Sequence, residues 1–149
     1  MSASNAFEND VLLLLLNNTN IANLGDATGV RGSTVAGSVF IALHTADPGE
    51  AGVQTTSEAT YTGYARVAVA RSSAGWTISG TAPTQAANAA ATTFGLCTAG
   101  SNVLTFFSVG RDTSGAGEIL ASGTLTASLT VSNGITPSFA IGQLTVTLD

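Results

Sequence analysis

The segment Thr124-Leu-Thr-Ala-Ser-Leu-Thr-Val131 decides the fold class, because its residue types alternate in steps of two. Successive side chains of a β-strand point to opposite faces of the sheet. The segment therefore predicts a strand with one apolar face on the core and one hydroxyl face toward solvent. The apolar face would carry Leu125, Ala127, Leu129 and Val131, and the hydroxyl face Thr124, Thr126, Ser128 and Thr130.

Segments on either side of this strand also indicate β-structure. Asn133-Gly134 is a strong turn signal. Short apolar or alternating segments bounded by turn residues predict further strands, roughly 8–12 residues apart, as is typical of a sandwich, jelly roll or closed barrel. These segments are 38–44, 61–71, 76–79, 103–109, 118–122, 138–141 and 144–148, with another near the end of the alanine-rich stretch 86–94.

The first 25 residues predict the one helix. Asn5 is expected to cap it, and Glu8 follows three residues later in the position of a capping-box acid. Apolar residues repeat at helical spacing from Phe7 onward, and Gly25 is expected to end the helix. Because the helix is apolar on almost every face, we expect it to be covered on more than one side, by its own domain or by a partner subunit.

These patterns predict an all-β, jelly-roll-like or sandwich/barrel single domain with an N-terminal α-helix. The helix is expected within residues 1–25, as part of the same domain, and the β-sandwich or jelly-roll domain within 26–149. The stretch 25–37 is rich in Gly, Thr, Asp and Ser and is expected to be a flexible loop. Its glycines do not have the spacing of a phosphate-binding motif.

Composition and charge exclude several classes of partner. The chain has 149 residues, of which 9% are charged, and its net charge is −5 with no lysine. Nucleic-acid binding requires cationic groups that neutralise phosphates, so no nucleic-acid partner is expected. No membrane partner is expected either, because the longest apolar run, 11–16, is far short of the ~20 residues of a membrane span. Acidic residues near the N-terminus and the absence of basic ones argue against a signal peptide and favour synthesis in the cytoplasm.

The sequence contains few residues that could carry catalysis or bind a metal. His44 is the only histidine and Cys97 the only cysteine, so no metal, no cofactor and no intrachain disulfide are expected. Cys97 is interpreted as a small buried apolar residue. A catalytic triad of His44, Asp47 and a serine is formally open, but no Gly-x-Ser-x-Gly motif supports it, and a turn-fixing hydrogen bond is the favoured role of His44. No residue is assigned as catalytic, and a glycosidase pair among the scattered carboxylates stays open.

The expected surface is informative, because its polar residues are mainly Thr, Ser and Asn rather than Lys and Glu. Such side chains lose little rotamer freedom at a contact, so the composition favours a permanent assembly. A sugar-binding surface would need exposed aromatic side chains, and the available ones are Trp76, Tyr61 and Tyr64. Trp76 shares a strand pattern with Ile78, so we expect it in the core.

Four blocks together resemble a family of small bacteriophage virion structural proteins, often labelled tail-fibre proteins. The blocks are 5–9 with the following leucine run, 42–50, 61–69 with Gly75-Trp76, and 131–139. The combination of Leu-His-Thr-Ala-Asp-Pro-Gly at 43–49 with Tyr-Thr-Gly-Tyr-Ala-Arg at 61–66 is the distinctive part. The resemblance implies a non-enzymatic protein, most closely a capsid decoration (cement) protein that bridges and stabilises major capsid proteins.

That resemblance also implies location and partners. The protein is expected in the virion, on the capsid surface rather than the tail, in contact with the phage major capsid protein and with copies of itself in a homodimer or homotrimer. A tail- or head-fibre module that binds a receptor or glycan is the alternative, and a hydrolase would require a pocket with His44 beside a serine or paired carboxylates. The residues expected to contact partners, or else to specify turns and strands, are His44, Asp47, Pro48, Gly49, Tyr61, Tyr64 and Arg66.

Overall fold

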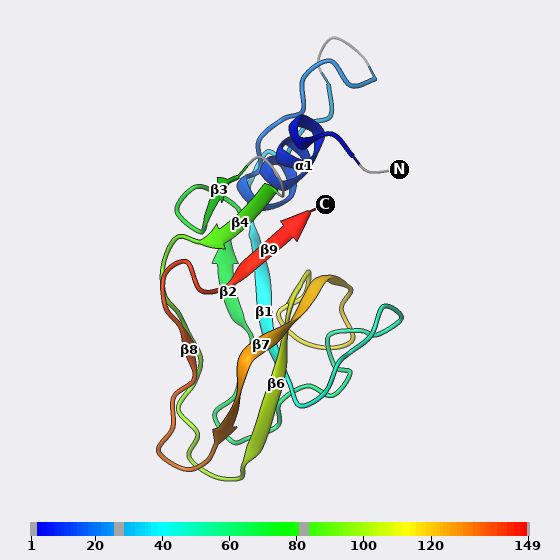
Figure 1. Ribbon diagram of the computed structural model, residues 1–149. Coiled ribbons are helices and arrows are strands. Elements are labelled where there is room, and N and C mark those ends of the chain that lie inside the picture. The colour runs from blue at the N-terminus through cyan, green and yellow to red at the C-terminus, as the bar shows by residue number, and fades with distance from the viewer. Residues whose placement is uncertain (1–2, 26–28, 81–83, 149) are drawn as a thin grey trace. The chain divides into compact units, whose positions relative to one another are not determined.

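The computed structural model describes residues 3–25, 29–80 and 84–148, which form one helix and nine strands (Figure 1). The strands make a four-stranded sheet in the order β2-β1-β6-β7, a three-stranded sheet β3-β4-β9 and a pair β5-β8. The predicted all-β class with an N-terminal helix is confirmed. The elements are α1 (Asn5–Asn17), β1 (Ser38–His44), β2 (Val67–Ala70), β3 (Trp76–Ser79), β4 (Thr84–Asn88), β5 (Thr92–Thr93), β6 (Asn102–Gly110), β7 (Ile119–Val131), β8 (Ser138–Phe139) and β9 (Thr145–Leu148).

The chain forms two compact units. The first combines residues 1–38, 70–91 and 139–149, and it contains α1 and the sheet β3-β4-β9. The second combines residues 39–69 and 92–138, and its centre is the antiparallel pairing of β1 with β6 and of β6 with β7. Each unit is therefore assembled from segments that are distant in sequence.

Helix α1 begins and ends earlier than the sequence predicts. Ser4, not Asn5, is the N-cap, and its hydroxyl accepts a hydrogen bond from the backbone N–H of Phe7. The helix ends at Asn17 rather than near Gly25, because Asn18 adopts a left-handed conformation with φ 55°. The N–H of Thr19 then donates to the carbonyl of Leu13 at 3.0 Å, which closes the last turn.

One side of α1 packs in the first unit against β3 and β4. Glu8, Leu12 and Leu16 are buried there, whereas Phe7 and Leu15 remain exposed. Val11, Leu13 and Leu14 are half-buried, so the described residues cover the apolar surface of the helix only in part.

The C-terminal end of α1 is held by Arg71. Its guanidinium donates to the carbonyls of Leu15 (2.6 Å), Leu14 (2.9 Å) and Ala36 (3.1 Å). The last turn has no basic residue of its own. Arg71 therefore supplies the positive charge that a helix C-terminus favours, and it joins the helix to the following loop.

The loop that follows α1, predicted to be flexible, is cross-linked by asparagine side chains in its described parts. Asn18 and Ser33 exchange two hydrogen bonds, of 2.8 and 2.7 Å. Asn20 accepts a third from the N–H of Gly32. A Cβ atom at Gly32 would lie 2.6 Å from the Asn18 side-chain oxygen, so glycine is required at this position.

Strand β7 is one continuous 13-residue strand at the edge of its sheet. The burial of its side chains alternates in steps of two from Ile119 to Thr126, but the predicted alternation is lost from Ala127 to Thr130. Leu104 of β6 pairs with Leu129, but Phe106 already pairs with Thr124, so residues 125–128 lie opposite a single residue. This bulge disrupts the two-residue period. Leu129 is consequently exposed, although it was expected to face the core.

The structure confirms two predicted core residues and one predicted turn, and it shortens one predicted strand. Trp76 and Cys97 are fully buried, as predicted. The N–H of Ile135 donates to the carbonyl of Ser132, which confirms the turn at Asn133-Gly134. The predicted strand 61–71 is wrong for most of its length, because only Val67–Ala70 is strand and the residues before it form turns and irregular backbone.

Candidate functional site

All seven residues predicted to contact partners belong to the second unit. His44, Pro48, Tyr61 and Arg66 are buried and Tyr64 is half-buried, while Asp47 and Gly49 are exposed. The structure thus divides them into an internal network and an exposed turn.

The internal network is built around an ion pair between Arg66 and Glu58. The Arg66 Nε donates to one carboxylate oxygen of Glu58 at 2.6 Å, and Nη2 donates to the other at 2.7 Å. The same guanidinium donates to the carbonyls of Asp112 (2.9 Å) and Gly115 (2.7 Å). The Arg66 side chain is 3% exposed, so its charge depends on these partners. The hydrogen bonds to Glu58 raise the pKa of Arg66 above its usual value.

Tyr64 joins this ion pair to β1 and to an aromatic cluster. Its hydroxyl donates to Glu58 at 2.9 Å and accepts from the backbone N–H of Leu43 at 3.0 Å. Its ring stacks on Phe94 and meets the ring of Tyr61 edge-on. Burial raises the pKa of Tyr64 above its usual value, so the hydroxyl stays protonated.

The same packing removes the aromatic surface that a sugar platform would need. Tyr61 is buried and its hydroxyl donates to the carbonyl of Gly95. Trp76 is also fully buried. Neither ring can therefore stack on a carbohydrate.

His44 lies beside a serine, but the pair is buried. Its Nδ1 is 2.8 Å from the carbonyl of Thr56, which can only accept, so Nδ1 carries the hydrogen and Nε2 accepts from the Ser108 hydroxyl at 2.8 Å. A nucleophile and a base can have this geometry. Both residues are 0% exposed. Neither lines the cleft beside Asp47 or the cleft over Arg66 on the surface of the second unit. Asp47 is not among the hydrogen-bond partners of His44, so these three residues do not form a triad.

The buried imidazole predicts a loss of stability in acid. Burial lowers the pKa of His44 and outweighs the opposing effects of the Thr56 carbonyl and Glu58, while the charge of Arg66 adds a smaller lowering. Below pH ~6.5 the unfolded chain binds a proton that the folded imidazole does not bind, so the free energy of unfolding falls as pH falls. We expect His44 to contribute a slope of up to about 1.4 kcal/mol per pH unit between pH 6.5 and its lowered folded pKa.

Urea denaturation of the wild type and of a His44→Gln variant between pH 5 and 7 measures this slope. The variant is expected to be less stable at pH 7 but to vary less with pH. An equal slope in both proteins would show that other groups dominate the acid response.

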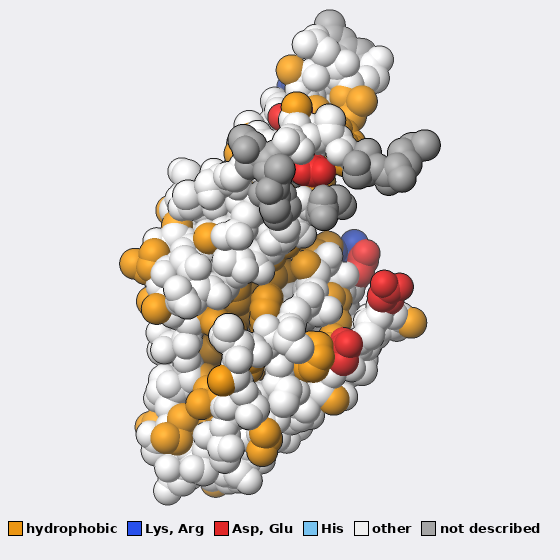
Figure 2. Space-filling view, viewed as in Figure 1, with side chains coloured by type: hydrophobic (Ala, Val, Ile, Leu, Met, Phe, Trp, Pro, Cys, Tyr) orange, Lys and Arg blue, Asp and Glu red, His pale blue; other side chains and the backbone are white. Residues whose placement is uncertain are grey.

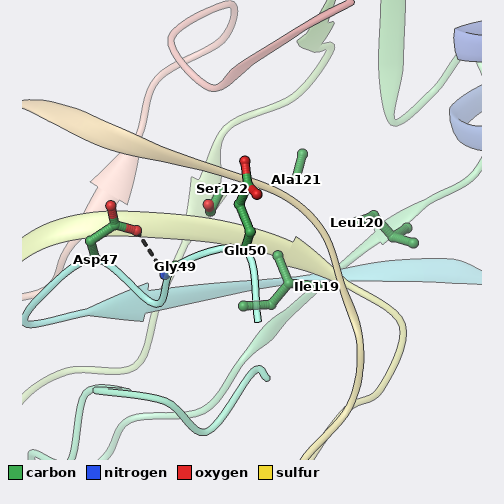
Figure 3. Close-up of a pocket in the computed structure, with 7 residues that line it drawn as sticks. All are labelled: Asp47, Gly49, Glu50, Ile119, Leu120, Ala121 and Ser122. Carbon is green, nitrogen blue, oxygen red and sulfur yellow. Dashed lines mark hydrogen bonds between the residues drawn. The ribbon is translucent and has the colours of Figure 1, made fainter. Parts of the chain in front are cut away.

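Two shallow clefts lie on the second unit. The first, of about 370 Å³, is lined by the turn after β1 and by the start of β7 (Figure 3). The second, of about 280 Å³, lies over the Arg66 network, whose ionic groups already bind one another. The first cleft is lined by Asp47, Gly49, Glu50, Ile119, Leu120, Ala121 and Ser122.

The first cleft therefore brings Asp47 and Gly49, two of the predicted contact residues, to a strand edge that sequence analysis did not connect with them. The carboxylate of Asp47 accepts a hydrogen bond from the N–H of Gly49, which shapes the turn. Only a pairing pattern across distant segments could have revealed the contact with β7.

Within 3–25, 29–80 and 84–148, no group of three or more His, Cys, Asp or Glu side chains is placed to hold a metal ion. No helix formed by these residues is both long enough and apolar enough to span a membrane.

The site as a whole consists of internally bonded polar groups and an open strand edge, as expected of a structural protein. The chain belongs to the podophage GP4 fiber I protein gp80 family, whose model matches residues 2–147. The predicted resemblance to small phage virion structural proteins is thereby confirmed, and the protein has a structural role in a bacteriophage particle. A comparison with curated proteins found no match.

Proposed function

We propose that this protein is a non-enzymatic subunit of a phage fibre and that it works by being held between other virion proteins. The observation that carries the proposal is the match of residues 2–147 to a family described as a fibre protein. Because the match covers nearly the whole chain, the family's structural role applies to the chain rather than to one part of it.

The character of the surface supports this proposal. Uncharged polar side chains and backbone cover most of the visible face, and acidic or basic side chains are few (Figure 2). Ordering Thr and Ser at a contact costs less entropy than ordering Lys or Glu. Several large apolar side chains are also exposed, among them Phe7, Leu15, Val35, Leu96, Val103 and Ile141.

The state of the reactive groups supports the non-enzymatic part of the proposal. The His44–Ser108 pair has no exposed surface, and the charge of Arg66 is bound by Glu58 and two carbonyls. These groups stabilise the second unit and are not presented to a substrate.

Capsid decoration is a second candidate, favoured by the absence of fibre-like architecture. The sequence has no long repeat, and the helix in the described part of the chain has only 13 residues, too short for a coiled-coil shaft. In this role the protein would bridge neighbouring major capsid proteins, with copies of itself as a dimer or trimer, and oppose the pressure of packaged DNA.

Phage particles that lack this protein distinguish the two roles. If the protein is a fibre subunit, the particles are expected to adsorb poorly to host cells while retaining DNA on heating as well as the wild type. If it is a decoration protein, they are expected to adsorb normally but to lose DNA at a lower temperature. An image reconstruction of the wild-type particle gives its position directly, and absence of the chain from purified virions would contradict both roles.

A further inference from the structure

The first cleft lies along the open edge of β7. In the sheet order β2-β1-β6-β7, strand β7 has β6 on one side and none of the described strands on the other. Val53 forms an isolated bridge with Glu118 directly before the strand begins. Between Ile119 and Thr124 it pairs with β6 as an antiparallel strand. In such a pair, alternate residues direct their backbone N–H and C=O groups away from the partner. This stretch can therefore hydrogen-bond to an added extended segment.

The side chains around this edge determine what can bind there. Asp47 and Glu50 are exposed, and neither forms an ion pair with any residue that the structure describes. Ile119 and the exposed Leu120 provide apolar surface beside them. The cleft thus favours a partner surface that carries both a cation and apolar side chains. Pairing of this edge with the same edge of another copy would bring four carboxylates together, which disfavours a symmetric contact.

The chain itself carries a surface of the complementary kind. Arg66 and Arg71 are bound by internal partners, and Arg111 pairs with Glu118 at 2.8 Å. Arg31 is exposed, and among the described residues it has neither an ion pair nor a side-chain hydrogen bond.

Two exposed apolar side chains accompany Arg31 in the sequence. Val30 and Val35 are exposed near it, Val35 at 81%. The intervening residues Gly32 and Ser33 are held by the asparagine side chains of the same loop. The Arg31 surface, defined as Val30, Arg31 and Val35, therefore combines a positive charge with two exposed apolar side chains on a loop whose backbone is held by hydrogen bonds at Gly32 and Ser33.

We propose that the Arg31 surface of one copy docks into the first cleft, along the start of β7, of a second copy. The charges are opposite, and both surfaces include exposed apolar side chains. The contact is made by side chains, because the backbone groups of Val30 and Ser33 are already bound within their own loop. The contact joins two different surfaces, so its repetition produces a ring if the geometry closes and a linear array if it does not. It rests on the proposed role of the protein as a virion subunit and names one of that subunit's partners.

Charge reversal tests the proposal on the full-length chain by sedimentation equilibrium. We expect the wild type to self-associate in a concentration-dependent manner. Arg31→Glu is expected to raise the Kd of self-association by at least about tenfold, because it places like charges together. Asp47→Asn with Glu50→Arg is expected to do the same, and the asparagine retains an acceptor for the Gly49 N–H. Combining both sets of changes is expected to restore association to within about threefold of the wild type.

Two controls accompany these variants. Asp10→Arg, on α1 and outside the cleft, changes the net charge of the chain as strongly as Arg31→Glu does and is expected to leave the Kd unchanged. Circular dichroism verifies that every variant is folded. Association is also expected to weaken in 1 M NaCl, since exposed charge pairs are screened by salt.

Three results would overturn the proposal. They are a wild type that is monomeric at every concentration, association insensitive to both reversals, and folded single variants whose combination fails to recover binding. A self-association that is lost in a Ser122→Pro variant but unaffected by Arg31→Glu would indicate symmetric edge pairing instead. The adsorption experiment on phage particles tests the fibre role separately from this contact. If particles without the protein adsorb poorly but the purified protein is monomeric at every concentration, the fibre role is supported and the contact is rejected.

Discussion

Replacing Glu58 with alanine is expected to lower the free energy of unfolding by about 3–5 kcal/mol, because it leaves a buried charge without its counterion. The Arg66 side chain is 3% exposed and the Glu58 side chain 15%. Two carbonyls would still accept from the guanidinium, but neither carries a full negative charge. Urea denaturation at neutral pH measures the loss.

The exposed pair of Arg111 with Glu118 provides a matched control. Both side chains are 61% exposed, so Glu118→Ala is expected to cost less than about 1 kcal/mol. A double variant, Glu58→Ala with Arg66→Met, is expected to be more stable than Glu58→Ala alone, because it removes the uncompensated charge. Equal losses in Glu58→Ala and Glu118→Ala would contradict the assigned role of the buried pair.

Gly63→Ala is expected to destabilise the protein by about 3 kcal/mol or more, and to prevent folding if the backbone cannot shift. Gly63 has φ +102°, a conformation that side-chain-bearing residues rarely adopt. A Cβ atom would also overlap the carbonyl oxygen of Leu96. Both effects act at the turn that positions Tyr61 and Tyr64, whose ring contact should be lost with it.

Gly49→Ala separates the two effects. Gly49 also has a positive φ, +68°, but no atom lies within 4 Å of the added Cβ. The backbone conformation alone should cost about 1–2 kcal/mol. Thermal or urea unfolding of both variants compares them, and a Gly63→Ala protein as stable as Gly49→Ala would show that the contact with Leu96 relaxes freely.

The fold class can be predicted from the sequence because strands and turns are specified by residues that are close together along the chain. Trp76 and the Asn133-Gly134 turn follow from strand pattern and turn chemistry, and the structure confirms both. The end of α1 does not follow in the same way, since Asn18 takes the left-handed conformation that glycine usually supplies, seven residues before Gly25. The bulge in β7 is also invisible locally, because it is a property of the pairing with β6.

The candidate site was only partly accessible from sequence for a related reason. The conspicuous residues of the two blocks, such as His44 and Arg66, were identified, but their partners were not. Ser108 is 64 residues from His44, and the carbonyl of Asp112 is 46 residues from Arg66. No periodicity or spacing encodes contacts across such distances. That these residues contact other proteins stays a prediction, although most of their polar groups bind within the chain.

The Arg66 network crosslinks distant segments of the chain, as disulfide bonds do in many extracellular proteins. One guanidinium ties together Glu58, Asp112 and Gly115, segments about fifty residues apart, in a protein whose single cysteine has no partner within the chain. A disulfide needs an oxidising compartment and can be reduced or exchanged. An ionic crosslink forms as soon as the chain folds. It is retained in both reducing and oxidising surroundings, because it contains no bond that can be reduced.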